Sequence, residues 1–202
     1  AIGAGIDAAV AAGARVISLS LGGGADSAMQ AAFSRARAAG TVLVVAAGND
    51  AGAVVDPLAQ AALSVAGTTT IVVGSVDATG AISGFSNRAG AAAPAYLATL
   101  GEAVRSFDNH GTAYLYSGTS IAVPAVAGAA ALLAQHFPNL TAAQIVDLLL
   151  RTARDAGDPG TDPVYGRGIL DIAAAFAPVG GTSIAGTATA IQSARLRAAP
   201  HS

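Results

Sequence analysis

The feature of this sequence that most constrains its fold is an apolar stretch from Ser117 to Gln135, S-G-T-S-I-A-V-P-A-V-A-G-A-A-A-L-L-A-Q. The stretch is far too long for a strand, so it predicts a helix, and a short alternating strand at residues 112–116 leads into it. Small residues at 117–119 make the turn between the two. Pro124 is expected within the first turn or so of the helix, where its missing N–H costs little. Ser120 is therefore expected at the start of the helix, beside free backbone N–H groups and the positive end of the helix dipole.

The composition favours a single domain with an apolar core. Of the 202 residues, 53% are hydrophobic and 11% are charged, and the net charge is −2. This balance argues against nucleic acid or an anionic membrane as the main partner. The absence of cysteine excludes disulfides and thiolate metal sites. The longest apolar run, residues 121–134, is interrupted by Pro124 and Gly128 and is shorter than a membrane span, so we expect a core helix and no membrane span in this chain.

The rest of the chain alternates between strand and helix patterns. Strands are predicted at residues 16–21, 41–47 and 71–76, and helices at 2–13, at 26–40, from Thr141 onwards and up to Phe176. This order predicts right-handed crossovers and a mostly parallel sheet between two helical layers, which is a three-layer αβα fold of the α/β class. Residues 89–110 are poorly patterned, and we expect a loop there with one short strand near Val104.

Two glycine-containing segments follow predicted strands directly. Leu21 and Gly22 come after the first strand, and Gly48 and Asn49 come after the second. Because parallel α/β sheets bind ligands at the carboxyl ends of their strands, these segments are expected to border a ligand crevice. A serine at a helix start, among free N–H groups, suits a nucleophile whose attack creates an oxyanion.

Several motifs together resemble the subtilisin-like serine peptidase family. Gly118-Thr119-Ser120-Ile121-Ala122, followed by Pro124 and Val126-Ala127-Gly128, is similar to the family's nucleophile motif. Ile121, Val123 and Ala125 depart from it, since the family usually has Met, a small hydroxyl residue and a non-catalytic His there. Further resemblances follow the family's order: Val16 to Gly22, Ala46 to Asn49, Phe85-Ser86-Asn87, and Tyr165 to Gly168.

The resemblance implies a subtilisin-like fold and a role for each matching segment. Ser120 would be the nucleophile, and the side-chain amide of Asn49 would join the Ser120 N–H in holding the oxyanion. Ser20, Leu21 and Gly22 would bind substrate on one wall of the cleft, and Ala47 and Gly48 on the other.

Each of these residues also has a purely structural interpretation. Ser120 could be a helix cap and Asn49 a turn residue at a strand end. Gly22 to Gly24 could belong to a dinucleotide-binding loop, but Ser27 breaks that motif. The pentapeptide G-T-S-I-A also recurs from Gly181 to Ala185 without a following Pro or long apolar run, so Ser183 is interpreted as part of a linker.

The sequence lacks an evident general base. Its only histidines are His110, His136 and His201, and the family's motifs for the catalytic Asp and His are absent. His110 stands in H-G-T, as the family's base does, but a strand rather than a helix follows it, so a hairpin histidine is the favoured interpretation. The chain therefore resembles the C-terminal portion of a peptidase domain (residues 1–178) followed by a Gly/Thr/Ala-rich tail or linker (residues 179–202).

We therefore expect a serine endopeptidase that acts on peptides or proteins and needs an upstream segment carrying the Asp and His. The alternative is a non-catalytic remnant that binds peptides by strand addition along residues 20–22. The family is usually exported, so a secreted or cell-envelope location is expected. It often binds calcium, but no acidic cluster here has ligand spacing, so no metal and no other cofactor is assigned.

Overall fold

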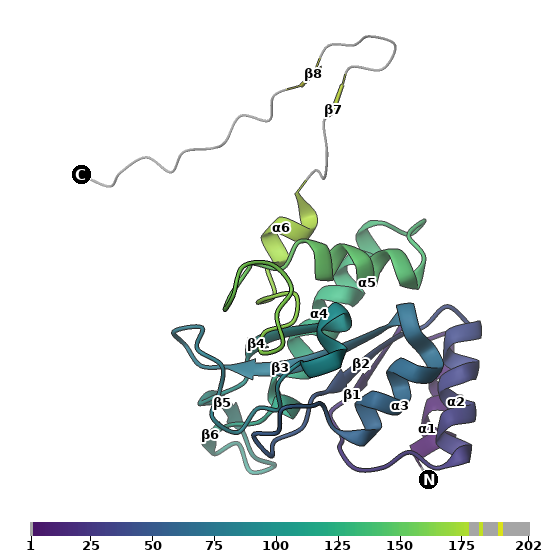
Figure 1. Cartoon of the computed structure of the whole chain (residues 1–202). Helices are drawn as coiled ribbons and strands as arrows, with labels where there is room; N and C mark the ends of the chain where they lie inside the picture. The colour runs from purple at the N-terminus through teal and green to yellow at the C-terminus, as the bar shows by residue number, and fades with distance from the viewer. Residues whose placement is uncertain (1, 178–181, 184–189, 192–202) are drawn as a thin grey trace.

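A four-stranded parallel sheet forms the centre of the molecule (Figure 1). The computed structural model describes residues 2–177, 182–183 and 190–191. The strands lie in the order β1 (Val16–Leu19), β2 (Val42–Ala46), β3 (Thr70–Val76) and β4 (Tyr96–Leu100). Every residue of β2 and β3 is buried, as expected for strands that are covered on both faces.

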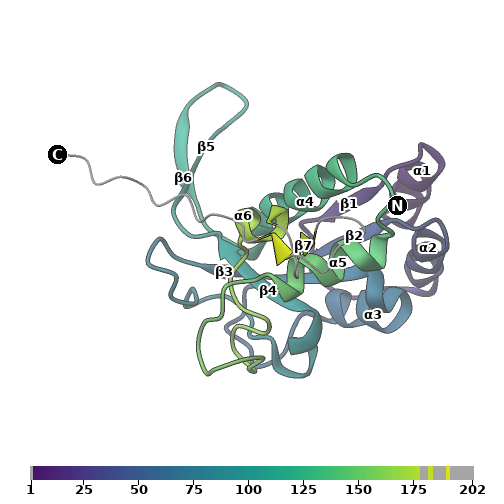
Figure 2. The ribbon, with the colours of Figure 1, turned by 90° about the horizontal axis from the view of Figure 1, so that it is seen from above.

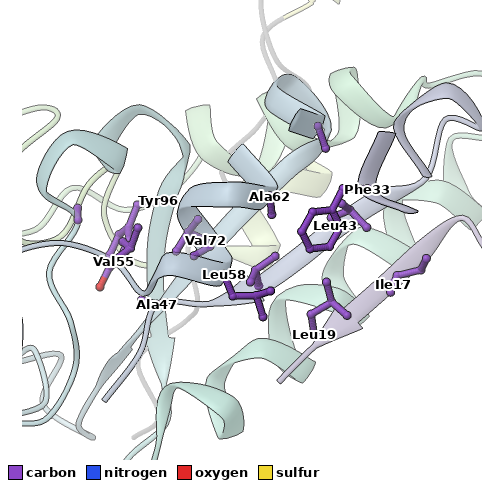
Figure 3. Close-up of a cluster of buried hydrophobic side chains, with 14 of the residues drawn as sticks. Ile17, Leu19, Phe33, Leu43, Ala47, Val55, Leu58, Ala62, Val72 and Tyr96 are labelled. Atoms are coloured by element: carbon purple, nitrogen blue, oxygen red, sulfur yellow. The ribbon is translucent and has the colours of Figure 1, made fainter. Parts of the chain in front are cut away.

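Helices cover both faces of this sheet, which confirms the predicted three-layer α/β fold. One face carries α1 (Ile2–Ala11), α2 (Ser27–Ala38) and α3 (Pro57–Ala66); the other carries α4 (Thr119–His136), α5 (Ala142–Arg151) and α6 (Ile172–Phe176). Alternate residues of a strand point to opposite layers. Leu43 packs with Phe33 and Leu58 in the first layer (Figure 3), whereas Val44 belongs to the cluster that α4 and α5 cover.

The central helix α4 is a core element, as the sequence predicts. By length and composition alone it is apolar enough to cross a membrane, and it is the one helix in the described part of the chain that meets this test. However, it contacts all four strands of the sheet, and Val126, Ala130 and Leu133 are fully buried. Its apolar composition is therefore accounted for by packing inside the domain.

Side-chain caps set where several helices begin. The carboxylate of Asp26 accepts the Met29 N–H at 2.7 Å and so caps the start of α2. Thr141, from which a helix was predicted, forms a capping box with Gln144 at the start of α5. Helix α3 was not predicted from the sequence. Asp56 is its N-cap and Pro57 is its first residue.

The prediction of a loop over residues 89–110 is wrong for residues 90–100, whereas the short strand predicted near Val104 is confirmed. This segment forms a short 3₁₀ helix η2 (Gly90–Ala95), the sheet strand β4 and the strand β5 (Val104–Phe107), with Val104 at the start of β5. β4 was missed because it is short, follows a proline and has the mixed sequence Y-L-A-T-L. The structure has another 3₁₀ turn, η1 (Gly67–Thr69), before β3, and residues 82–85 contribute only an isolated bridge between Ile82 and Val76.

Two strands form an arm outside the main sheet. β5 pairs antiparallel with β6 (Ala113–Tyr116), and the hairpin extends away from the rest of the domain (Figure 2). Near the C-terminus, β7 (Thr182–Ser183) pairs with β8 (Ala190–Ile191), so the second copy of the pentapeptide does not start a helix at Ser183. The rest of the predicted tail, residues 179–202, and the proposed boundary at 178 lie outside the described residues.

Tyr96 anchors β4 in the core. Its side chain is fully buried, and its hydroxyl donates a hydrogen bond of 2.9 Å to the carbonyl oxygen of Asn87. Gly74 on β3 leaves room for the ring, because a Cβ at that position would collide with the Tyr96 hydroxyl. Burial raises the pKa of the Tyr96 hydroxyl to about 12, since ionisation would place a charge in the core.

This pKa predicts a loss of stability at high pH that depends on Tyr96. The unfolded chain releases the phenol proton near the ordinary pKa of 10.0, and the folded chain holds it to about 12. The free energy of unfolding should therefore fall by about 1.4 kcal/mol per pH unit between these values. Tyr96→Phe should lower stability by about 1 kcal/mol at neutral pH and remove this component of the pH dependence. Denaturant unfolding of both proteins from pH 8 to 12 measures this pH dependence. If the free energy of unfolding falls with pH at the same slope in the two proteins, the assignment is contradicted.

Candidate functional site

The side chain of Asn49 joins the end of β2 to the start of α4. Its Oδ1 atom accepts hydrogen bonds from the Thr119 N–H (2.8 Å) and the Thr119 hydroxyl (3.0 Å). The Gly48 N–H in turn lies 3.3 Å from the Thr119 hydroxyl oxygen. These bonds fix which way the Asn49 amide faces, because the oxygen is held by Thr119 and the nitrogen, Nδ2, is directed elsewhere.

Gly118 lies directly beside Ser120 and Asn49. It has φ of 155° and caps α4 at the point where the chain enters the helix. A Cβ at Gly118 would lie 3.3 Å from Ser120 Oγ, 3.8 Å from the Ser120 nitrogen and 3.9 Å from Asn49 Nδ2. A hydroxyl and two N–H donors therefore surround one position, which is the arrangement that an oxyanion-forming nucleophile requires.

Ser20 contacts the backbone of Ser120 directly. The Ser20 hydroxyl donates a hydrogen bond of 2.8 Å to the Ser120 carbonyl oxygen. Pro124 makes this carbonyl available: it is the sixth residue of α4, and it has no N–H to donate to the residue four positions earlier. The expectation that Pro124 lies within about the first turn thus needs a small correction: Pro124 lies in the second turn, and its missing hydrogen bond is replaced by one from Ser20, the residue after β1.

The other predicted substrate-binding residues lie on two neighbouring segments. Leu21 is exposed and Gly22 lies next to the carboxylate of Asp56, while Ala47 and Gly48 are buried at the end of β2. Asp56 links the two segments, since its N–H donates to the Ala47 carbonyl oxygen (2.7 Å) and its Oδ1 accepts the Gly23 N–H (2.9 Å). The carboxyl ends of β1 and β2 thus meet beside Ser120, as predicted.

None of the hydrogen bonds within the described residues joins a histidine side chain to Ser120. His110 is exposed in the turn between β5 and β6, where its N–H donates to Asp108. His136 ends α4, at the opposite end from Ser120, and its ring packs edge-on against Phe137. His201 lies outside the described residues. The hairpin position of His110 is therefore confirmed.

A metal ion in a protein is commonly held by several acidic or His side chains that lie close together. Within the described ranges, no group of three or more His, Asp or Glu side chains lies close enough together to hold one.

The geometry of the site agrees with the similarity of this sequence to known proteins. The sequence model of the subtilase family matches residues 1–168, and this chain belongs to that family. Subtilisin DY of Bacillus licheniformis is 36% identical over 183 residues, which cover 87% of this chain and 61% of that protein. Fervidolysin of Fervidobacterium pennivorans is 36% identical over 194 residues, or 87% of this chain and 27% of that protein.

Solved structures of two proteases share the fold. The patellamide maturation protease PatA superimposes with a TM-score of 0.73 and 30% identity, covering 87% of this chain and 66% of the other. The prenylagaramide maturation protease PagA gives a TM-score of 0.73 and 25% identity, covering 86% and 65%. This chain thus spans less than two thirds of the length of each of these four relatives.

Two residues that contribute to the site geometry were not assigned a role from the sequence. Thr119 stands beside Ser120 in the motif, but nothing in the sequence indicates that both its N–H and its hydroxyl bind Asn49. Asn87 belongs to the Phe-Ser-Asn motif, and only the structure shows its contacts with the segment around Asn49.

Gly118 and Gly128, which lie at the start and in the middle of α4, should respond oppositely to alanine. Gly118→Ala forces a side chain into a conformation that almost only glycine adopts, so it should lower the free energy of unfolding by about 1–3 kcal/mol. Gly128 is exposed, helical and has open space around its Cβ position, so Gly128→Ala should raise it by up to about 1 kcal/mol. Urea unfolding of both variants tests this; a neutral Gly118→Ala would show that the helix start relaxes.

Proposed function

We propose that this chain is the part of a subtilisin-like serine endopeptidase that carries the nucleophile, Ser120, and the oxyanion-binding groups. The observation that carries the proposal is the convergence of Ser120 Oγ, the Ser120 N–H and Asn49 Nδ2 around one position beside Gly118. Membership of the subtilase family supports it.

In the proposed reaction, Ser120 Oγ attacks the carbonyl carbon of the scissile peptide bond as its proton passes to a general base. The carbonyl oxygen becomes an oxyanion, which accepts hydrogen bonds from the Ser120 N–H and Asn49 Nδ2. Collapse of this intermediate breaks the C–N bond, the amine leaves with a proton from the base, and water then hydrolyses the acyl-enzyme. The reaction uses no cofactor.

The general base and the group that orients it would come from an upstream segment. The described residues bring no histidine into hydrogen-bond contact with Ser120, and a serine hydroxyl without a base is a weak nucleophile. Within the described residues β1 pairs only with β2, so its other edge is free to pair with strands of that segment. The proposal also places the protein outside the cytoplasm, secreted or in the cell envelope, as the family resemblance implies.

Substrate would bind as an extended strand beside residues 20–22. These residues are exposed and continue directly from β1. Ser20, Leu21 and Gly22 would form one wall and Ala47 with Gly48 the other. The same surface supports the second candidate, a non-catalytic relative that binds peptides by strand addition without cleaving them.

The proposal predicts that residues 1–202 alone do not hydrolyse peptides beyond a residual level and that adding the upstream segment restores activity. The oxyanion donors alone leave about 10³–10⁴-fold catalysis over water in serine proteases that lack their triad. The assay compares hydrolysis of a fluorogenic peptide by the isolated chain and by the reassembled protein.

Two alanine variants are matched controls for this assay, because both serines lie in G-T-S-I-A. Ser120→Ala should abolish the restored activity, whereas Ser183→Ala should leave it unchanged. Equal losses from the two substitutions would contradict the assignment of Ser120. Full activity from the isolated chain that disappears with His110→Ala would instead place the base in the hairpin. Peptide binding without hydrolysis by the reassembled protein would favour the second candidate.

A further inference from the structure

The segment that carries Asn49 is attached to one buried residue, Asn87, through both its backbone N–H and its side chain. Both chain neighbours of Asn49 bond to it: the Gly48 carbonyl oxygen accepts the Asn87 N–H at 3.0 Å, and Asn87 Oδ1 accepts the Asp50 N–H at 3.0 Å. The same Oδ1 accepts the Gly52 N–H at 2.8 Å. Asn87 is only 4% exposed, so its hydrogen bonds are shielded from water.

Gly48 packs closely against the side chain of Asn87, because it has no Cβ. It has φ of 104°, and a Cβ there would collide with the Asn87 side-chain amide. Ala51 has φ of 54°, a conformation that costs energy in a residue other than glycine and persists only where surrounding contacts hold it. Those contacts are the bond from the Ala51 N–H to the Phe85 carbonyl oxygen (2.8 Å) and the bond from the Gly52 N–H to Asn87 Oδ1 (2.8 Å).

Asn87 is itself held in place from behind. Its carbonyl oxygen accepts hydrogen bonds from the Tyr96 hydroxyl (2.9 Å) and the Ser86 hydroxyl (3.1 Å). Tyr96 is fully buried in β4, so its hydrogen bond fixes the position of Asn87 relative to the central sheet. A continuous chain of contacts thus runs from β4 through Asn87 to the backbone on both sides of Asn49.

We propose that Asn87 is a positioning residue that fixes the backbone around Asn49 so that Asn49 Nδ2 faces the oxyanion position before substrate binds. Thr119 holds the side-chain oxygen of Asn49, and Asn87 holds the backbone of its two chain neighbours, Gly48 and Asp50. Both attachments are needed, because a side chain bonded at its end still moves if the loop beneath it moves. The expected effect of Asn87 on catalysis rests on the proposed function, whereas its expected effect on the backbone around Asn49 does not.

The structural arm measures amide hydrogen exchange by NMR in this chain. Asn87→Ala should speed exchange at Asp50 and Gly52 at least tenfold, while Asn87→Asp, which keeps the acceptor oxygen, should preserve protection. Thr141→Ala is the matched control, since it removes the cap of α5 without touching this loop. If Asn87→Ala does not fold, Asn87→Ser replaces it, because its hydroxyl is too short to reach both amides. Unchanged exchange at Asp50 and Gly52 would overturn the proposal even if the protein hydrolyses nothing.

The catalytic arm uses the reassembled protein and a double-mutant cycle. Asn87→Ala should lower kcat about ten- to a hundredfold with little change in KM, because the misplaced donor binds mainly the transition state. In a background of Asn49→Leu the same substitution should have no further effect on kcat. Thr141→Ala should leave kcat unchanged in both backgrounds. Equal losses with and without Asn49, or an effect confined to KM, would show that Asn87 does not act through Asn49.

Discussion

The hydrogen bonds between Asn49 and Thr119 are the interaction on which the arrangement of this site depends. They join residues 70 positions apart in the sequence, one at the end of a buried strand and the other at the start of a buried helix. Core packing brings β2 and α4 together, and burial of apolar surface supplies most of the energy for this. The polar contacts then fix which way the Asn49 side-chain amide faces, which packing alone does not specify.

The backbone of the site uses residues that are unfavourable elsewhere. Gly48 and Gly118 adopt positive φ angles; a Cβ at Gly48 would collide with the Asn87 side-chain amide, and one at Gly118 would lie 3.3 Å from Ser120 Oγ. Pro124 removes a helical hydrogen bond and leaves the Ser120 carbonyl oxygen to accept the Ser20 hydroxyl. Each departure from regular structure is thus matched by a specific contact with another segment, which is the pattern expected at a functional site.

Much of this structure could be predicted from the sequence, and the limits have physical causes. The buried runs around Val44 and Val73 and the long apolar helix gave the parallel sheet and its central helix, because periodicity and length are local signals. Strand β4 was missed since its five residues carry no clear alternation. The contacts of Thr119 and Asn87 could not be predicted, because hydrogen bonds between distant segments leave no pattern in either segment.

The central claim is that Ser120, and no other serine, becomes the activated nucleophile once an upstream segment supplies the base. Labelling with a fluorophosphonate, which reacts with base-activated serine hydroxyls, followed by peptide mapping tests it most directly. The account predicts that the reassembled protein is modified at Ser120 alone and that the isolated chain is not modified. Label at Ser183 or another serine, or substrate hydrolysis by the reassembled protein with Ser120 unmodified, would contradict it.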